Sequence, residues 1–266
     1  MGFAAKSRFF AFMLVPVLIT GVAGAAGSTP SANGAGGSTP PADARKDDSS
    51  YFSQHFSTDA LGSDIKDAVV RANLAAVSFK KIVVHTHDQL TATGQTKPGS
   101  YDVAITLENA GSGLVRRMET VQHDGTMTVA RFDLTYRGYF SFLTQSVPAN
   151  AGALPPIVEA RKVIRFDTNT DGHMNFTYLY GSTGKPTFSD PGQVVCDSGK
   201  SYSASSLNQA IEGQAHELDC QFVDTNGIVT DKMKLAYLEK YGVALMLHLQ
   251  NADSTIDSSI VDFNVE

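Results

Sequence analysis

The sequence has no tryptophan, only two cysteines and no excess of basic residues among its 266 positions. Two cysteines are too few for a small disulfide-dense fold, and a hydrophobic content of 42% excludes disorder along the whole chain. Lysine and arginine number 21 against 27 acidic residues, so the net charge of −6 offers no basic surface for nucleic acid. The Gly-x-Ser-x-Gly, His-Glu-x-x-His and dinucleotide-binding motifs are also missing. These absences favour a non-catalytic protein without excluding an enzyme.

Residues 1–25 have the three parts of a secretory signal peptide. Lys6 and Arg8 form a short basic segment, residues 9–22 are largely apolar, and residues 23–25 are small enough for peptidase cleavage. An uncleaved membrane anchor is the alternative, but the apolar stretch is shorter than the roughly 20 residues that a span needs. No later segment is long and apolar enough to span a bilayer. We therefore expect an exported protein, periplasmic or extracellular, with no transmembrane segment in the mature chain.

Residues 26–50 are predicted to be a flexible Gly/Ser/Thr/Pro linker. From Gly27 to Ser50 the chain has no Ile, Leu, Val, Phe, Met or Tyr, and Gly-Ser-Thr-Pro occurs twice. Such a segment can bury nothing, so nothing opposes the entropy lost on ordering it. Residues 51–266 remain as a single β-rich domain.

The hydrophobic pattern predicts one amphipathic helix followed by strands. Between Thr58 and Ala76, Leu61, Ile65, Val69 and Ala72 recur at intervals of three and four. After Ser78 the period becomes two, which is typical of strands. The predicted strands cover residues 79–90, 101–107, 114–122, 127–135, 139–145, 163–167, 174–180, 193–196, 217–223, 232–238, 244–250 and 258–265.

Three dipeptides indicate tight turns between these strands. Asp-Gly at 124–125 and 171–172 and Asn-Gly at 226–227 are residue pairs that hairpins use for positive φ. A short helical turn is predicted for residues 205–211, and a loop for residues 150–156. Roughly a dozen strands joined by hairpins predict a mainly β fold. We expect a curved antiparallel sheet, or a partly open barrel or sandwich, with the helix near its N-terminus.

Cys196 and Cys220 are predicted to form a structural disulfide. They are an even pair in a protein expected to be exported, and each lies on a predicted strand. A redox-active pair is the alternative, but Cys-x-x-Cys is absent. The loop that this bond closes would stabilise the fold by about 3 kcal/mol in the chain-entropy model.

The segment from Asp167 to Asn175 matches part of a calcium loop. Side-chain oxygens at Asp167, Asn169, Asp171 and Asn175 occupy positions 1, 3, 5 and 9, the His173 carbonyl stands at position 7, and glycine stands at position 6. Hard cations bind where several oxygens converge on a sharply turned loop. Over these nine residues the segment resembles the calcium loops of EF-hand and dockerin modules and of integrin-type propeller blades.

The match to the EF-hand is incomplete. Position 12 is Tyr178 rather than a bidentate glutamate, and the flanking residues predict strands rather than helices. A hairpin whose Asp and Asn side chains bind their own backbone explains the same residues more simply. Calcium is therefore the only cofactor that the sequence suggests, and none is assured.

Two other patterns have a simple structural explanation. His85 and His87 face the same side of a predicted strand, but no spacing selects the further ligands that zinc needs. Tyr136, Phe140 and Phe142 share one parity and Tyr139 the other, so both faces of one strand could carry aromatic rings. Core packing explains the rings, and a strand beside an apolar ligand groove would have the same pattern.

We carry three hypotheses of function. The first is an exported non-catalytic binding protein of the cell envelope or extracellular space, holding a lipid-like or other hydrophobic ligand or contacting an envelope protein. The second is a calcium-stabilised extracellular interaction module that uses residues 167–175. The third is a secreted hydrolase whose site is assembled from scattered residues, in a cleft where a histidine meets Ser or Asp.

Overall fold

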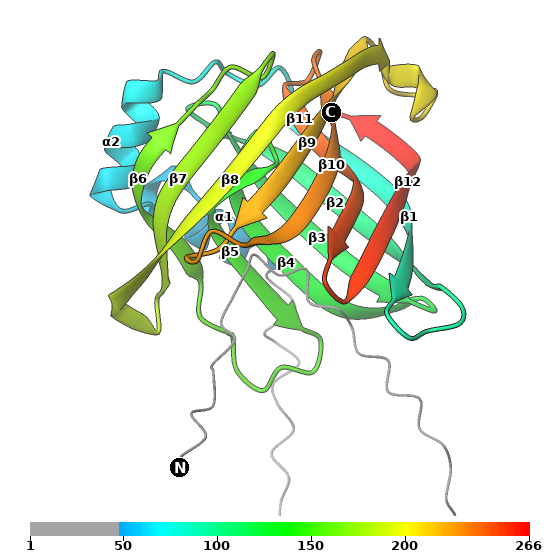
Figure 1. Ribbon diagram of the computed structural model, residues 1–266, viewed down its shortest axis with the longest axis horizontal. Helices are drawn as coiled ribbons and strands as arrows, with labels where there is room; N and C mark the ends of the chain where they lie inside the picture. Colours follow the sequence, from blue (N-terminus) through cyan, green and yellow to red (C-terminus); the bar gives the residue numbers. More distant parts are fainter. Residues whose placement is uncertain (1–47) are drawn as a thin grey trace, which may run out of the picture.

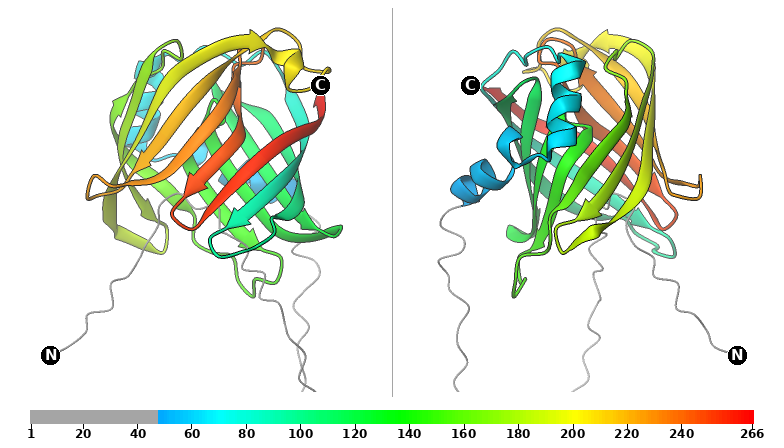
Figure 2. Two further views of the ribbon diagram at one scale, coloured as in Figure 1. Left: turned by 45° about the vertical axis from the view of Figure 1, so that its right-hand side comes forward. Right: turned by 90° about the vertical axis from the view of Figure 1, so that its left-hand side faces the viewer.

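The computed structural model describes residues 48–266. The predicted signal peptide (1–25) and most of the predicted linker (26–50) lie outside the described residues. Helix α1 (Asp48–His55) begins three residues before the predicted domain boundary and was not predicted. A 3-10 turn (Thr58–Ala60) and helix α2 (Ser63–Ala72) follow it along one side of a β-barrel (Figures 1 and 2).

Twelve antiparallel strands form a closed barrel. Each strand pairs with its neighbours in sequence, and β1 closes the circle by pairing with β12 from Ile82↔Val265 to Ala92↔Ser254. This confirms the predicted mainly β class, and closure replaces the partly open alternatives. The strands are β1 (Lys81–Ala92), β2 (Gly99–Gly111), β3 (Leu114–His123), β4 (Thr126–Tyr136), β5 (Phe140–Pro148), β6 (Val158–Phe166), β7 (His173–Ser182), β8 (Lys185–Ser203), β9 (Gln214–Val223), β10 (Val229–Leu238), β11 (Val243–Asn251) and β12 (Ser254–Val265).

Two seams in the barrel have few backbone pairs. Strands β5 and β6 share only Leu143↔Glu159 and Thr144↔Val158, and β11 and β12 share three pairs from His248↔Asp257 to Gln250↔Thr255. The seams divide the barrel into two groups of six strands. We call β12 and β1–β5 the first half and β6–β11 the second half.

The helices cover the first of these seams. Ile65 and Val69 of α2 are buried, and α2 packs against β6. Figure 2 shows α2 lying along the barrel wall next to β6. Phe52 of α1 and Phe56, the residue after α1, pack against Phe132 of β4 with ring centroids 5.7 and 5.8 Å apart. Because apolar side chains seal this side, the few hydrogen bonds between β5 and β6 do not leave the core open.

The helix predicted for residues 58–76 is shorter than expected. Gly62 precedes the first residue of α2, and Asn73 ends the helix in the left-handed conformation with φ of 45°. Asparagine tolerates this conformation better than most residues, which makes it a common helix terminator. The predicted turn at 205–211 is present as a 3-10 turn (Ala204–Ser206).

The aromatic run does not lie on one strand, which corrects the parity argument. Tyr136 ends β4 and Phe140 begins β5, with Arg137 and Gly138 between them at φ of 54° and 85°. A Cβ on Gly138 would lie 2.8 Å from the Ala244 carbonyl oxygen, so glycine is needed here. The hairpin resets the alternation of side chains, and all four aromatic residues (Tyr136, Tyr139, Phe140 and Phe142) are buried in one core.

Candidate ligand-binding site

A cluster of four charged side chains lies inside the barrel on β3 and β4. Arg117 Nη2 lies 2.5 Å from Glu119 Oε1, and Arg131 Nε lies 2.9 Å from Asp133 Oδ2. Arg117 also contacts Asp133 at 3.8 Å and donates to the Gly138 carbonyl at 2.9 Å. Residues two apart on a strand point to the same side, so the spacing 117/119 and 131/133 directs all four charges inward.

The charges in this cluster stabilise one another. Asp133 is fully buried, and burial alone would lower the pKa of Arg131. The neighbouring charges of Asp133 and Glu119 outweigh burial, and the pKa of Arg131 is raised. Arg131 therefore stays protonated, since an opposite charge within a few ångströms favours the ionised form.

Asp88 of β1 lies inside the barrel close to this cluster but has no basic partner of its own in the described chain. Asp88 is only 3% exposed, and its Oδ1 atom has no hydrogen-bond partner of good geometry among residues 48–266. Burial raises the pKa of Asp88, and the charge of Glu119 raises it further. The hydroxyls of Thr86 and Ser258 and the charge of His87 act in the opposite direction but do not cancel the rise.

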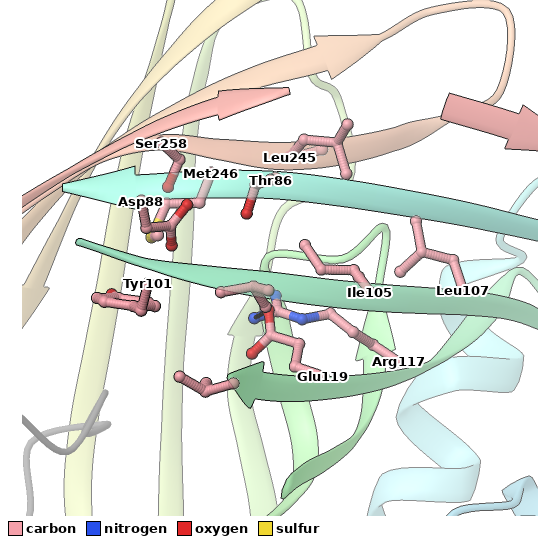
Figure 3. Close-up of a pocket in the computed structure, with 13 residues that line it drawn as sticks. Thr86, Asp88, Tyr101, Ile105, Leu107, Arg117, Glu119, Leu245, Met246 and Ser258 are labelled. Atoms are coloured by element: carbon pink, nitrogen blue, oxygen red, sulfur yellow. Dashed lines mark ion pairs between the residues drawn. The ribbon is translucent and has the colours of Figure 1, made fainter. Parts of the chain in front are cut away.

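A cavity of about 40 Å³ opens beside Asp88 (Figure 3). Tyr101, Arg117, Glu119 and Ser258 contribute polar atoms, while Ile105, Leu107, Leu245 and Met246 form apolar walls, as do Val103, Val121 and Ala244. Ser258 Oγ is buried and makes no hydrogen bond of good geometry within residues 48–266, although it lies close enough to Asp88 to lower the pKa of that carboxyl. The space holds a few water molecules or one small group, whereas drug-sized ligands occupy roughly 300–1,000 Å³.

A second buried acid lies in the other half of the barrel. Asp231 of β10 is 9% exposed, its Oδ2 lacks a partner within residues 48–266, and burial raises its pKa. The residues two and four positions further along β10 are the apolar Met233 and Leu235. The barrel interior therefore holds two carboxyl groups that no arginine or lysine in the described chain neutralises.

Sequence reasoning missed these interior charges, although a signal was present. In β1 the buried positions are Ile82, Val84, Thr86, Asp88 and Leu90. Asp88 therefore lies on the face of β1 that points to the core. An acidic residue at one of the alternate positions that are otherwise apolar indicates a buried charge. Arg117 and Glu119 of β3 likewise alternate with the same spacing as Val121, which lines the same cavity.

The predicted disulfide is present. Cys196 of β8 and Cys220 of β9 are paired residues on adjacent strands with Cα atoms 4.0 Å apart, and their sulfurs are bonded. Both are buried in the core. The bond joins two strands of the second half.

The predicted calcium loop lies between β6 and β7. Asp167 accepts hydrogen bonds from Arg165 Nε at 3.0 Å and from the Asn175 backbone N–H at 3.0 Å. Asn169 Oδ1 accepts from the Asp171 N–H at 3.1 Å. Hydrogen bonding to Arg165 lowers the pKa of Asp167, and the Asn175 N–H contributes in the same direction.

The side chains of His173 and Asn175 also have protein partners. His173 Nδ1 lies 2.8 Å from Asp197, and Asn175 Oδ1 accepts from Thr177 at 2.9 Å. Among residues 48–266, no three His, Cys, Asp or Glu side chains gather in a way that could hold a metal ion. Asparagine and backbone oxygens supply much of a calcium loop, so the calcium hypothesis stays a prediction.

The turns at the three Gly-containing dipeptides differ from one another. Asp124 and Gly125 have φ of 49° and 72°, and Gly227 has φ of 77°, as the hairpin prediction requires. Gly172 does not have a positive φ, contrary to expectation. The connection from Phe166 to His173 is longer than a two-residue turn, so it does not need the left-handed conformation.

Histidines form ion pairs on the outer surface rather than a shared site. His85 lies 3.4 Å from Asp262, and His87 lies 2.9 Å from Asp102. His248 and Asp257 form a similar pair at 2.7 Å. Each ring meets an aspartate, but on the exposed surface rather than in a cleft, and in the described residues none is hydrogen-bonded to a serine hydroxyl, so the hydrolase hypothesis stays a prediction.

No family model matches the sequence, and no curated protein is similar to it. Three solved structures share a distant likeness. A domain described as an outer membrane lipoprotein-sorting protein, from Vibrio parahaemolyticus, is 8% identical with a TM-score of 0.38, covering 79% of this chain and 93% of its own. A DUF1329 family protein from Desulfovibrio piger is 6% identical with a TM-score of 0.34, covering 76% and 91%. A β-barrel-like protein of the DUF1849 family from Brucella abortus is 9% identical with a TM-score of 0.42, covering 72% and 100%.

These likenesses are too distant to support an inference about function. Within residues 48–266, no helix has the length and apolar character needed to cross a membrane. The barrel interior, with its cavity and buried charges, is therefore the place to which a function can be assigned.

Proposed function

We propose that this chain is an exported, non-catalytic binding protein that takes a small hydrophobic or lipid-like ligand into its barrel at Asp88. The observation that carries the proposal is the cavity lined by β1, β2, β3, β11 and β12, where apolar walls surround the Asp88 carboxylate, which has no basic partner in the described chain, and the Ser258 hydroxyl. Ligand sites commonly combine apolar walls with a few polar groups that fix orientation. The interior of this barrel contains that combination on a small scale.

Export is supported by the disulfide as well as by the predicted signal peptide. Structural disulfides persist in oxidising compartments such as the periplasm and the extracellular space. The bond between Cys196 and Cys220 is buried, which suits a structural rather than a catalytic role.

A ligand larger than the cavity requires the barrel to open, and the β11–β12 seam has few backbone pairs and is not the seam that α1 and α2 cover. Only three residue pairs join the strands, close to their hairpin. Further along, Asn208 Nδ2 donates to the carbonyls of Ile260 and Val261 at 3.3 and 3.1 Å. A side chain thus satisfies β12 carbonyls that β11 does not reach. Leu245, Met246 and Ser258 beside this seam line the cavity, so separation of the strands would enlarge it.

Binding of a neutral apolar dye, N-phenyl-1-naphthylamine, tests the proposal. We expect saturable fluorescence with the mature oxidised protein and loss of most of it in Ser258→Leu, whose larger side chain fills the cavity beside Asp88. Ser259→Leu is the matched control, because Ser259 is the exposed next residue of the same strand. Unfolding midpoints of both variants report whether the barrel is intact. Absence of saturable binding to the wild type, or equal binding to folded Ser258→Leu, would overturn the proposal.

A further inference from the structure

The charged groups at and beside the cavity do not balance. Arg117 and Arg131 face three acids, namely Glu119, Asp133 and Asp88. The two arginines are engaged by Glu119 and Asp133, and no basic group in the described chain lies within ion-pair distance of Asp88. One buried carboxylate is therefore in excess, and an ionised carboxylate is expensive to bury without a partner.

Asp88 has unused capacity to accept hydrogen bonds where the cavity opens. Asp88 Oδ1 is buried without a hydrogen-bond partner of good geometry, and the hydroxyls of Thr86 and Ser258 lie beside Asp88 in the same lining, close enough to lower its pKa (Figure 3). A primary ammonium group has three N–H donors and one positive charge. The three side chains offer three oxygen acceptors and one negative charge in a space of about 40 Å³.

The surroundings disfavour an anionic group at the same place. Glu119 is close enough to Asp88 for its charge to raise the pKa of Asp88. A carboxylate or phosphate would meet two negative charges there. The guanidinium of Arg117 offers little compensation, because Glu119, Asp133 and the Gly138 carbonyl already surround it.

We propose that the interior site is selective for an amphiphile with a positively charged ammonium group, which Asp88 binds as counter-ion while Thr86 and Ser258 accept its remaining hydrogens. The apolar part of the ligand lies against Ile105, Leu107, Leu245 and Met246. This inference rests on the proposed binding function and specifies the chemical class of its ligand.

Three probes with the same twelve-carbon chain separate charge from hydrophobicity. Dodecylammonium, dodecanol and dodecanoate compete with N-phenyl-1-naphthylamine below their aggregation concentrations at neutral pH. We expect dodecylammonium to bind about tenfold more tightly than dodecanol, and dodecanoate to bind most weakly, because a charge-assisted bond replaces a neutral one. Asp88→Asn, which keeps the size of the side chain, should remove the preference for ammonium, so that dodecylammonium binds no more tightly than dodecanol.

Asp102→Asn is the matched control, since it removes one negative charge from the outer face of the neighbouring strand β2. It should keep the full preference. Binding of all three probes with equal affinity, or a preference that persists in Asp88→Asn, would overturn the charge selectivity while leaving the proposed binding function intact. Failure of every probe and of the dye to bind would overturn the proposed function itself.

Discussion

The two halves of the barrel fill their interiors with different chemistry. The first half holds the ion cluster of β3 and β4 and the unpartnered Asp88. The second half is mostly apolar and carries the disulfide; its buried residues include Met174, Phe176, Tyr178, Val194, Cys196, Leu218 and Cys220. Aromatic contacts cross the helix-covered seam, where Phe140 stacks on Phe176 with centroids 4.9 Å apart.

The contrast shows what each kind of interior demands. An apolar side chain needs only a space of the right shape. A buried charged side chain needs an opposite charge nearby, or hydrogen bonds to its polar atoms. Arg117, Glu119, Arg131 and Asp133 meet this demand together. Asp88 does not, and an unmet demand beside a cavity is the reason to assign function there rather than in the apolar half.

Removal of Asp133 should have the largest effect. Asp133→Asn leaves Arg131 buried without its counter-ion, and breaking a buried ion pair typically costs about 3–5 kcal/mol of unfolding free energy. Urea unfolding followed by circular dichroism measures the change. A loss below about 1 kcal/mol would mean that the cluster is hydrated and contributes like a surface pair.

The control for this variant lies in the second half. Asp219 of β9 is more than half exposed and lies 3.8 Å from Lys234. Asp219→Asn makes the same chemical change on the outer surface, where an ion pair contributes at most about 1 kcal/mol. Equal losses in the two variants would abolish the distinction between a charged and an apolar interior.

Removal of the disulfide tests the second half. The double substitution Cys196→Ala and Cys220→Ala removes the bond between two residues that are 24 positions apart in the sequence. It should lower the free energy of unfolding by about 3 kcal/mol. Reducing agent should lower the stability of the wild type and leave the double variant unchanged. Equal stability of the oxidised wild type and the double variant would show that packing alone holds β8 and β9 together.

The sequence predicted the strands well because burial alternates along them. Ile82, Val84 and Leu90 in β1 show the period of two, and all twelve predicted strands have counterparts in the barrel. The predicted helix was too long. Gly62 and Asn73, which flank the actual helix, interrupt the helical hydrophobic period of 3.6 residues only weakly. Disulfide pairing followed from the presence of only two cysteines.

Closure of the barrel and assembly of the site could not be predicted in the same way. The pairing of Ile82 with Val265 joins the two ends of the domain, and no local pattern encodes it. The cavity likewise combines β1, β2, β3, β11 and β12. A single strand reveals that Asp88 points inward, but only the register of its neighbours reveals that no base reaches it.

The next effect is a difference in pH dependence between the wild type and Asp88→Asn. Burial, reinforced by Glu119, raises the native pKa of Asp88 above that of the unfolded chain, while Thr86, Ser258 and His87 oppose the rise. Below the unfolded pKa the carboxyl is protonated in both states and costs nothing. As pH rises towards the native pKa, the native state binds more protons than the unfolded state, so the wild type loses stability.

Asp88→Asn should therefore gain stability relative to the wild type across this window, at about 1.4 kcal/mol per pH unit, and the difference should level off above the native pKa. Unfolding in urea between acidic and neutral pH measures it. Asp231→Asn makes the same comparison in the second half, where burial also raises the native pKa. A difference that is flat with pH would mean that water reaches Asp88 and keeps it ionised.

The smallest effect concerns calcium at the loop between β6 and β7. We expect millimolar calcium to move the thermal midpoint by less than about 1 °C, whereas a site filled tenfold above its dissociation constant would raise it by roughly 3–5 °C. Arg165 already binds the carboxylate of Asp167 and lowers its pKa, so a cation would have to displace a guanidinium. Scans in EDTA, calcium and magnesium make the measurement. A rise specific to calcium that disappears in Asp167→Ala and Asp171→Ala would establish a calcium loop. It would also place a functional charge in the second half, at its surface rather than in its apolar interior.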